Sequence, residues 1–322
     1  MIFILFMAKR DNSRIIYYLS LIGFFAIFST TISKNPVLSL YTKALGADAF
    51  IIGLIAAISP LAGILFSFPI GMISDKIGKK KLLVVSAFIF LISPLLYLFV
   101  SSAAWLIPIR FFHGIATAIL GPVVSSLIVS VYTKDKGEKL GIYSSSTLAG
   151  RTIAPLLAGF ILSYFISYGN FFSFKAVYIA AFLSALPVLI LVSVIKEHKT
   201  ELKKLRLDFY SDLSYIWMEK RILTAALIEM AVYFAFGSLE TYLPLYLSAY
   251  GIEPYKIGII FSVQVLSIAV SQPIFGKIAD RIDKRLQILS GVLMLGIAIG
   301  ILGLFHSIYS VTLIAILFGF GL

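Results

Sequence analysis

The chain alternates between long apolar runs and short polar stretches, and this alternation is its main structural signal. A helix needs roughly 20 mostly apolar residues to cross a lipid bilayer. Runs of this kind lie at 15–41, 49–74, 82–101, 105–132, 141–164, 176–195, 221–247, 255–279, 286–304 and 308–322. The pattern predicts an all-α polytopic membrane protein with ten helical segments, of which the last is short for a span.

The composition agrees with a membrane protein. Of the 322 residues, 60% are hydrophobic and 13% are charged, whereas soluble domains have about 45–50% apolar and about 25% charged residues. The chain has no cysteine, and its three histidines, His113, His198 and His306, lie far apart in the sequence. Disulfides and thiolate metal sites are therefore excluded, and we expect no metal site.

The positive charges mark one side of the membrane. If the N-terminus is placed in the cytoplasm, 21 of the 27 Lys and Arg residues fall on the cytoplasmic side of the apolar runs. Lys43, Lys175 and Lys256 fall on the other side. Because cytoplasmic loops are enriched in Lys and Arg, we expect a multi-pass protein of the plasma or inner membrane with a cytoplasmic N-terminus. The clusters account for the net charge of +12 without a contiguous basic face, so no nucleic-acid partner is expected.

The sequence repeats itself at an offset of 205 residues. The stretch that begins GMISDKIGK at Gly71 recurs as GKIADRIDK at Gly276, and Gly53 recurs as Gly258. The seventh apolar run therefore starts a second unit in the same orientation as the first. Parallel repeats of this kind are typical of secondary transporters.

The repeat divides the chain into an N-terminal six-helix bundle at 1–195, a cytoplasmic linker at 196–220 and a C-terminal bundle at 221–322. An apolar stripe in the linker predicts a helix that either lies along the membrane surface or packs on the bundle; it comprises Phe209, Leu213, Ile216 and Trp217. Residue 322 corresponds to residue 117, midway through the fourth run. We therefore expect a chain truncated in its tenth helix, with a genuine ten-helix protein as the alternative.

Two stretches resemble motifs of the major facilitator superfamily. GMISDKIGKKK at 71–81 is similar to the signature between the second and third helices, with lysines at two positions where arginine is usual. RFFHG at 110–114 resembles the fourth-helix motif of proton-linked members, with His113 where glutamine is common. The resemblance implies the fold of this family, two parallel six-helix repeats, with roughly ten of the twelve helices present.

A third stretch, GRTIAPLLAG at 150–159, resembles the fifth-helix motif of drug/proton antiporters. That motif normally reads Gly-Pro and then Gly-Gly, where this chain has Ala-Pro and Ala-Gly. Its small residues form a ridge at four-residue spacing that suits close helix packing; the motif residues are Gly150, Ala154, Pro155 and Gly159.

The family resemblance implies a conformational gate at the first motif. There a carboxylate caps a facing helix N-terminus, whose dipole favours negative charge, and in the family this partner is the eleventh helix. The gating residues and their repeat counterparts are Gly71, Asp75, Lys76, Gly78, Lys79, Gly276, Asp280 and Arg281. Alternatively, the lysines only fix the topology.

Several charged residues fall inside apolar runs. A charge at the bilayer centre costs roughly 2.5–3.5 kcal/mol on insertion scales, so such residues are functional by default. Asn35 maps onto Glu240 through the repeat, so Lys34 and Glu240 are expected to face each other across the cavity. They form either a proton-exchanging switch or a structural pair near the rim.

Further candidates for proton coupling or substrate binding are Arg110, His113, Arg151 and Glu229, with Gln264 as a weaker cavity residue. Arg110 resembles the coupling arginine of the family, and a structural arginine that snorkels to the interface is the alternative. Arg151 is expected to meet an anionic substrate or a buried acid.

These features predict a secondary active transporter that moves a small organic solute by alternating access, with proton-coupled efflux by antiport favoured. The alternatives are proton-coupled uptake of an organic anion and a transport-inactive membrane scaffold or receptor. No phosphate-binding Gly-rich loop or nucleophile triad is found, so we expect no enzyme activity. We expect no cofactor, with the proton gradient as the energy source, and a monomer in the lipid bilayer.

Overall fold

The computed structural model describes residues 14–132, 134–195, 219–279 and 282–322, and this part of the chain is almost entirely helical. Residues 196–218 of the predicted linker, with the apolar stripe, and Asp280 and Arg281 lie outside the described residues. The long helices are α2 (Ile15–Ile32), α3 (Val37–Ala44), α4 (Ala49–Ile77), α5 (Lys79–Tyr97), α6 (Leu106–Val131), α7 (Lys136–Phe165), α8 (Asn170–Val194), α10 (Lys220–Ala249), α11 (Pro254–Ala279), α12 (Lys284–Leu302) and α13 (Ile308–Gly321), with short 3-10 helices η2 (Ala103–Trp105) and η3 (Ile166–Tyr168).

The prediction of ten helical segments is confirmed. Within the described residues, nine apolar stretches are long enough to cross a membrane, and α13 is a shorter tenth. The first segment was predicted wrongly as one continuous helix, because α2 ends at Ile32 and α3 begins at Val37. Pro36 accounts for the break, since its nitrogen has no hydrogen to donate and its ring clashes with the preceding turn.

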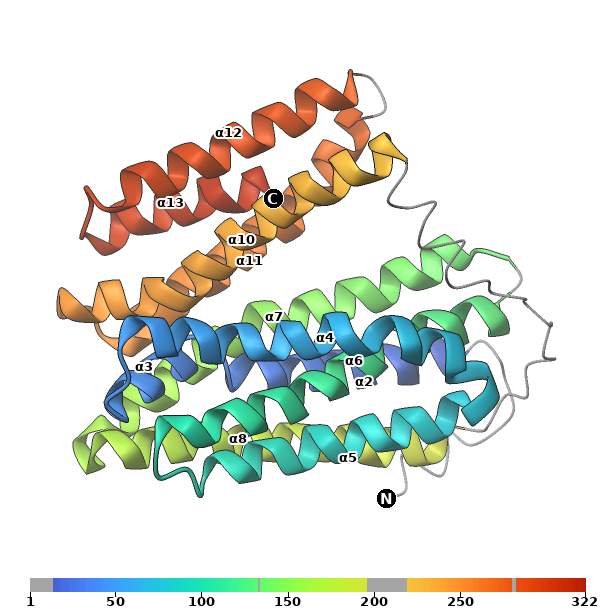
Figure 1. Cartoon of the computed structure of the whole chain (residues 1–322), viewed down its shortest axis with the longest axis horizontal. Helices are drawn as coiled ribbons and strands as arrows, with labels where there is room; N and C mark the ends of the chain where they lie inside the picture. Colours follow the sequence, from blue (N-terminus) through green and yellow to red (C-terminus); the bar gives the residue numbers. More distant parts are fainter. Residues whose placement is uncertain (1–13, 133, 196–218, 280–281) are drawn as a thin grey trace.

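The helices form two bundles, each with its own apolar core (Figure 1). Helices α2 to α8 pack around two clusters of buried side chains. Helices α10 to α13 pack around a third, in which Leu247, Phe261 and Phe318 are almost fully buried. Helical secondary structure satisfies every backbone group within its own segment, which a lipid environment requires.

The 205-residue repeat reappears as matching contacts in the two bundles. The Tyr41 hydroxyl donates to the Tyr97 carbonyl at 3.4 Å. Its counterpart Tyr246 donates to the Leu302 carbonyl, the counterpart of Tyr97, also at 3.4 Å. In both bundles, therefore, a tyrosine of the first membrane span bonds to the last residue of the third span. The helices are α3 and α5 in the N-terminal bundle and α10 and α12 in the C-terminal bundle.

A helix crossing is repeated in the same way. A methyl group on Gly114 of α6 would lie 2.6 Å from the Ser59 carbonyl oxygen of α4. A methyl group on its counterpart Gly319 would lie 2.8 Å from the carbonyl oxygen of Gln264, the counterpart of Ser59. Glycine is required at both crossings because the backbones approach too closely for any side chain.

The main contact between the bundles joins α7 to α11. A methyl group on Gly159 would clash with the Pro254 carbonyl oxygen, and one on Gly258 would clash with the Pro155 carbonyl oxygen. Two backbones therefore meet here with glycines on both sides. Such smooth surfaces let membrane helices approach closely and gain van der Waals contact.

The two bundles are close at one end of the molecule and diverge at the other. We call the end with the connections at 78 and 132–135 the basic end, because Lys and Arg cluster there, and the other the opposite end. Helix α10 contacts α3 and α4. Figure 1 shows α10 beside α3 at the opposite end and sloping away from α4 towards the basic end.

The α7–α11 contact makes a prediction about stability. Gly258→Ala should lower the stability of the protein by about 1–3 kcal/mol, the usual cost of overpacking. Gly296→Ala in α12 is the matched control, because its added methyl group has no atom within 4 Å and alanine favours helix. Thermal unfolding in detergent measures both, and an equal loss in the two variants would contradict the contact.

Candidate functional site

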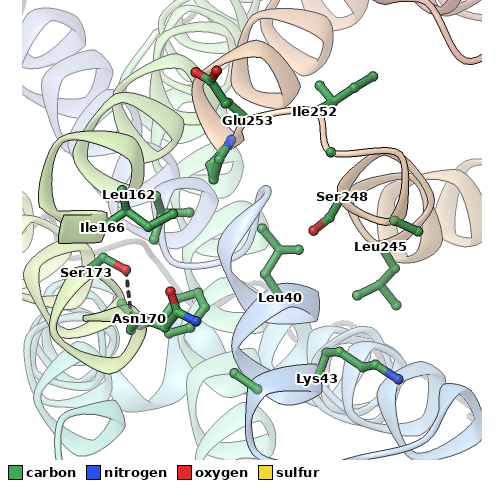
Figure 2. A pocket seen from close by; sticks show the side chains of 15 residues that line it. Leu40, Lys43, Leu162, Ile166, Asn170, Ser173, Leu245, Ser248, Ile252 and Glu253 are labelled. Carbon is green, nitrogen blue, oxygen red and sulfur yellow. Dashed lines mark hydrogen bonds between the residues drawn. The ribbon is translucent and has the colours of Figure 1, made fainter. Parts of the chain in front are cut away.

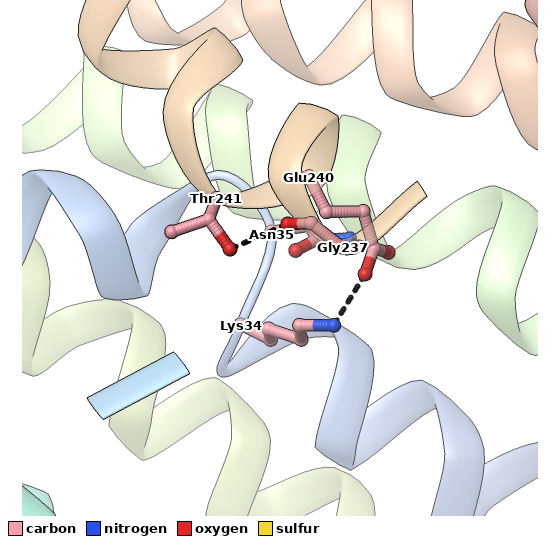
Figure 3. A network of polar contacts seen from close by, with 5 residues as sticks. All are labelled: Lys34, Asn35, Gly237, Glu240 and Thr241. Carbon is pink, nitrogen blue, oxygen red and sulfur yellow. Dashed lines mark hydrogen bonds and ion pairs between the residues drawn. The ribbon is translucent and has the colours of Figure 1, made fainter. Parts of the chain in front are cut away.

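The two bundles are joined by a buried polar cluster of Lys34, Asn35 and Glu240 (Figure 3). The Lys34 ammonium forms an ion pair with Glu240 Oε2. Asn35 Nδ2 donates to Glu240 Oε1 at 2.8 Å. Both carboxylate oxygens of Glu240 are therefore bound by side chains of the other bundle.

The break in the first helix positions two members of this cluster. Lys34 and Asn35 lie in the turn between α2 and α3, whereas Glu240 projects from the continuous helix α10. Asn35 and Glu240 are equivalent through the repeat, and they contact each other directly. The contact therefore lies on the axis that relates the two bundles.

Burial makes this ion pair energetically important. Glu240 is 8% exposed, and the Lys34 side chain is 26% exposed. The Arg151 guanidinium adds a favourable electrostatic interaction with the Glu240 carboxylate. A charge in a membrane interior is tolerated when it is paired, so the state of Glu240 determines whether the bundles attract each other here.

Two further contacts join the bundles at the opposite end of the molecule, where they lie close together (Figure 1). The Tyr242 hydroxyl donates to the Ala49 carbonyl at 3.0 Å, and the Tyr255 N–H donates to Ser163 Oγ at 3.0 Å. Each bond joins one bundle to the other. All of these contacts lie at the opposite end, and they must break before the bundles can separate there.

The structure does not bring Arg110 and His113 to this cluster. Both are buried in the N-terminal bundle, at 2% and 1% exposure. His113 Nε2 shares a hydrogen bond with the Thr30 hydroxyl at 3.2 Å. Gln264 is buried in α11, and neither of its amide atoms has a hydrogen-bond partner among the residues that the structure describes.

Glu229 also lies apart from the cluster. It is exposed on α10, eleven residues before Glu240, which corresponds to about 16 Å along a helix. Arg151 is exposed on α7 and is linked to Glu240 only electrostatically. Of the predicted charged residues, therefore, Lys34 and Glu240 are the two that form a direct contact.

The predicted gating motif lies at the basic end. Gly78 ends α4 and starts α5 with φ at 100°, a conformation that favours glycine. Lys79 Nζ donates to the Ser126 carbonyl at 3.4 Å. Lysine is well placed there because Ser126 lies near the C-terminal end of α6, where the helix dipole favours positive charge.

Other gating residues have few contacts within the described chain. A methyl group on Gly71 would lie 4.0 Å from the Pro122 side chain, and one on Gly276 would meet no atom of the described residues within 4 Å. Lys76 is exposed, and the side chain of Asp75 lies outside the described part of the structure. The proposed role of Asp75 therefore stays a prediction.

The fifth-helix motif packs on two sides. A methyl group on Gly150 would lie 2.6 Å from the Phe24 carbonyl oxygen of α2, and Gly159 meets α11 as described above. Ala154 and Pro155 are buried between these contacts. The ridge of small residues in α7 thus packs on α2 of its own bundle and on α11 of the C-terminal bundle.

A cavity of about 540 Å³ lies at the opposite end, between the two bundles (Figure 2). Its walls are mainly apolar, with Lys43 and Glu253 on opposite sides and Asn170 and Ser173 as polar groups. This cavity could not be predicted from the sequence, because its walls come from the ends of several helices that are distant in sequence.

Two parallel helical repeats that meet at a buried ion pair define a secondary membrane transporter. The family model described as "Major Facilitator Superfamily" matches residues 19–322. The chain belongs to this family, and its members and structural neighbours are transporters, not enzymes.

Individual relatives agree with this assignment. The chain is 28% identical to an uncharacterized MFS-type transporter of Methanocaldococcus jannaschii, over 81% of this chain and 67% of that protein. It is 25% identical to the multi-drug resistance efflux pump PmrA of Streptococcus pneumoniae, over 86% of this chain and 69% of that protein.

Among solved structures, a bacterial homolog of the human lysosomal transporter Spinster, in an inward-facing and unoccupied conformation, has a TM-score of 0.74 and 17% identity. The match covers 96% of this chain and 73% of that one. This similarity confirms the fold.

The ion pair predicts a specific pattern of mutational effects. Lys34→Met and Glu240→Gln alone should each destabilise the protein by about 3–5 kcal/mol, because each leaves a buried charge unpaired. The double variant should lose less than the sum of the two, with a coupling energy of about 1–3 kcal/mol. Unfolding of the four proteins in detergent measures this coupling, and strictly additive losses would show that the pair does not interact.

Proposed function

We propose that this protein is a proton-coupled transporter that exports small organic solutes by alternating access. In this proposal the basic end and the N-terminus face the cytoplasm, in agreement with the distribution of Lys and Arg. The conformation described here is then inward-facing, with the outer end closed. The proton gradient supplies the energy, and one chain forms the transport unit.

The observation that supports coupling is the contact of Glu240 with Lys34 and Asn35. Glu240 binds the other bundle through both carboxylate oxygens. A proton on one oxygen would remove the negative charge and make that oxygen a much weaker acceptor for the Lys34 ammonium. Proton binding therefore weakens the closure of the outer end.

This geometry supports a direction of proton movement. When the outer end opens, Glu240 separates from Lys34, and an unpaired carboxylate in a low-dielectric site favours the protonated form. When the outer end closes, the approach of Lys34 favours loss of the proton. In this proposal protons are taken up from outside and released towards the cytoplasm, as any transporter driven by the proton gradient requires.

The nature of the solute is inferred from the relatives. PmrA is named a multi-drug resistance efflux pump, and another relative is a quinolone resistance protein of Staphylococcus aureus, 26% identical over 73% of this chain. The buried acid Glu240 would suit a cationic or neutral organic solute, because a cation can compete with Lys34 for Glu240.

Transport by vesicles that contain the protein tests the proposal. We expect cationic or neutral organic solutes to move against their gradient when a pH gradient is imposed, with protons moving in the opposite direction. Glu240→Gln should abolish this gradient-driven movement and retain downhill flux, because the glutamine cannot exchange a proton. Glu229→Gln is the control, since Glu229 lies apart from the contact between the bundles.

Each other outcome argues against a defined part of the proposal. Flux that does not depend on the pH gradient would exclude proton coupling. Coupled transport by Glu240→Gln would remove Glu240 from the mechanism. Accumulation of an anionic solute together with protons would instead favour the uptake alternative.

A further inference from the structure

A second buried polar cluster lies inside the N-terminal bundle. We define the Arg110 cluster as Arg110 and His113 of α6, Tyr97 at the end of α5 and Tyr178 of α8. All four residues are 2% exposed or less. The rings of Tyr97 and Tyr178 are stacked with their centroids 4.4 Å apart, and the Tyr97 and His113 centroids are 6.4 Å apart.

One positive charge dominates this cluster. The Arg110 guanidinium interacts electrostatically with Tyr97, His113 and Tyr178. In the part of the chain that the structure describes, no carboxylate forms an ion pair with Arg110. The guanidinium therefore differs from Lys34, whose charge is compensated by Glu240.

The cluster also presents hydrogen-bond donors without partners. Arg110 Nε, His113 Nδ1, Tyr97 Oη and Tyr178 Oη are buried and form no hydrogen bond of standard geometry with the described residues. The Tyr97 oxygen interacts with the Arg110 guanidinium as an acceptor, which leaves its O–H group to donate. His113 Nε2 shares a hydrogen bond with the Thr30 hydroxyl, and in the tautomer in which that hydroxyl donates, the ring hydrogen of His113 is on Nδ1. Four N–H or O–H groups are then available, one of them on a permanent cation.

Such a set of groups has the chemistry of an anion site. Buried polar groups in proteins are almost always satisfied, so four unsatisfied groups in one cluster require an explanation. A cation with several N–H and O–H donors and no carboxylate complements a single negative charge. We propose that the Arg110 cluster binds one small monovalent inorganic anion, such as chloride.

The size of the anion follows from the burial of the cluster. Each of the four side chains is packed inside the bundle, so a large organic anion would need the aromatic rings to separate. A halide needs only a small volume, can accept from several N–H and O–H donors, and would neutralise the guanidinium. Charge compensation of this kind is especially favourable inside a membrane.

The cavity at the opposite end provides an access route. Phe174 lines this cavity, and its ring centroid lies 5.1 Å from that of Tyr41. The Tyr41 centroid in turn lies 5.6 Å from that of Tyr178. Two aromatic rings thus connect the cavity wall to the Arg110 cluster, and rotation of aromatic side chains would admit a small ion.

The Arg110 cluster is separate from the contact between the bundles. The charged groups that act on Glu240 are Lys34 and Arg151, whereas the one that acts on His113 is Arg110. The anion site therefore neither requires proton coupling nor follows from it. We expect it to bind an anion in the purified protein, where there is no proton gradient.

Anion binding to the purified protein tests this proposal without any transport assay. The protein is prepared in detergent with gluconate as the only anion and then titrated with chloride. We expect saturable binding of radioactive chloride at one ion per chain, together with a saturable rise in the unfolding temperature of a few degrees. Acetate in place of chloride should bind at least tenfold more weakly, because it is larger.

Two variants identify the site. Arg110→Gln should abolish chloride binding. Tyr178→Phe keeps the stacked ring and removes one hydroxyl, so it should weaken binding about tenfold, as expected for one hydrogen bond to a charged group. Tyr143→Phe is the matched control, because it removes the hydroxyl of another buried tyrosine of the same bundle and should leave chloride affinity unchanged.

Several results would overturn the proposal. If the wild-type protein binds no chloride up to several hundred millimolar, the unsatisfied donors are met by water alone. If Tyr178→Phe and Tyr143→Phe bind chloride with the wild-type affinity, the ion lies elsewhere. If acetate binds as tightly as chloride, the site accepts organic carboxylates and the inorganic assignment is wrong.

Discussion

The architecture depends on one buried carboxylate that is shared between two bundles. Glu240 belongs to the C-terminal bundle, and both of its oxygens are bound by residues of the N-terminal bundle. Each bundle has its own apolar core, so apolar packing alone would hold each bundle together without fixing their relative position. In lipid, where apolar burial gives little drive for association, a paired charge and close backbone contact decide how the bundles sit.

Much of the fold could be predicted from the sequence, because the bilayer imposes simple rules on it. Apolar runs gave the number of helices, and the 205-residue offset gave their parallel arrangement. The break before Val37 was not predicted, because an apolar run indicates the length of a span and not a break within it. Helix starts such as Lys79 were also missed, since polar residues in a first turn carry no apolar signal.

The candidate site was only partly accessible from the sequence. The Lys34–Glu240 contact could be inferred because the repeat places Asn35 and Glu240 at equivalent positions. The Arg110 cluster could not, since Tyr97 and Tyr178 look like ordinary membrane tyrosines until packing brings them together. Likewise, the close approach of Gly159 to Pro254 is a long-range contact that no local pattern specifies.

The contact between Asn35 and Glu240 has a further consequence for how such a protein can evolve. A residue on the axis between two copies of the same unit faces its own counterpart. Two identical glutamates there would repel each other, and two asparagines could bond but could not exchange a proton. A contact at this position that depends on charge therefore requires that the two copies differ in sequence. The protein can form it only because its internal repeat is inexact at Asn35 and Glu240.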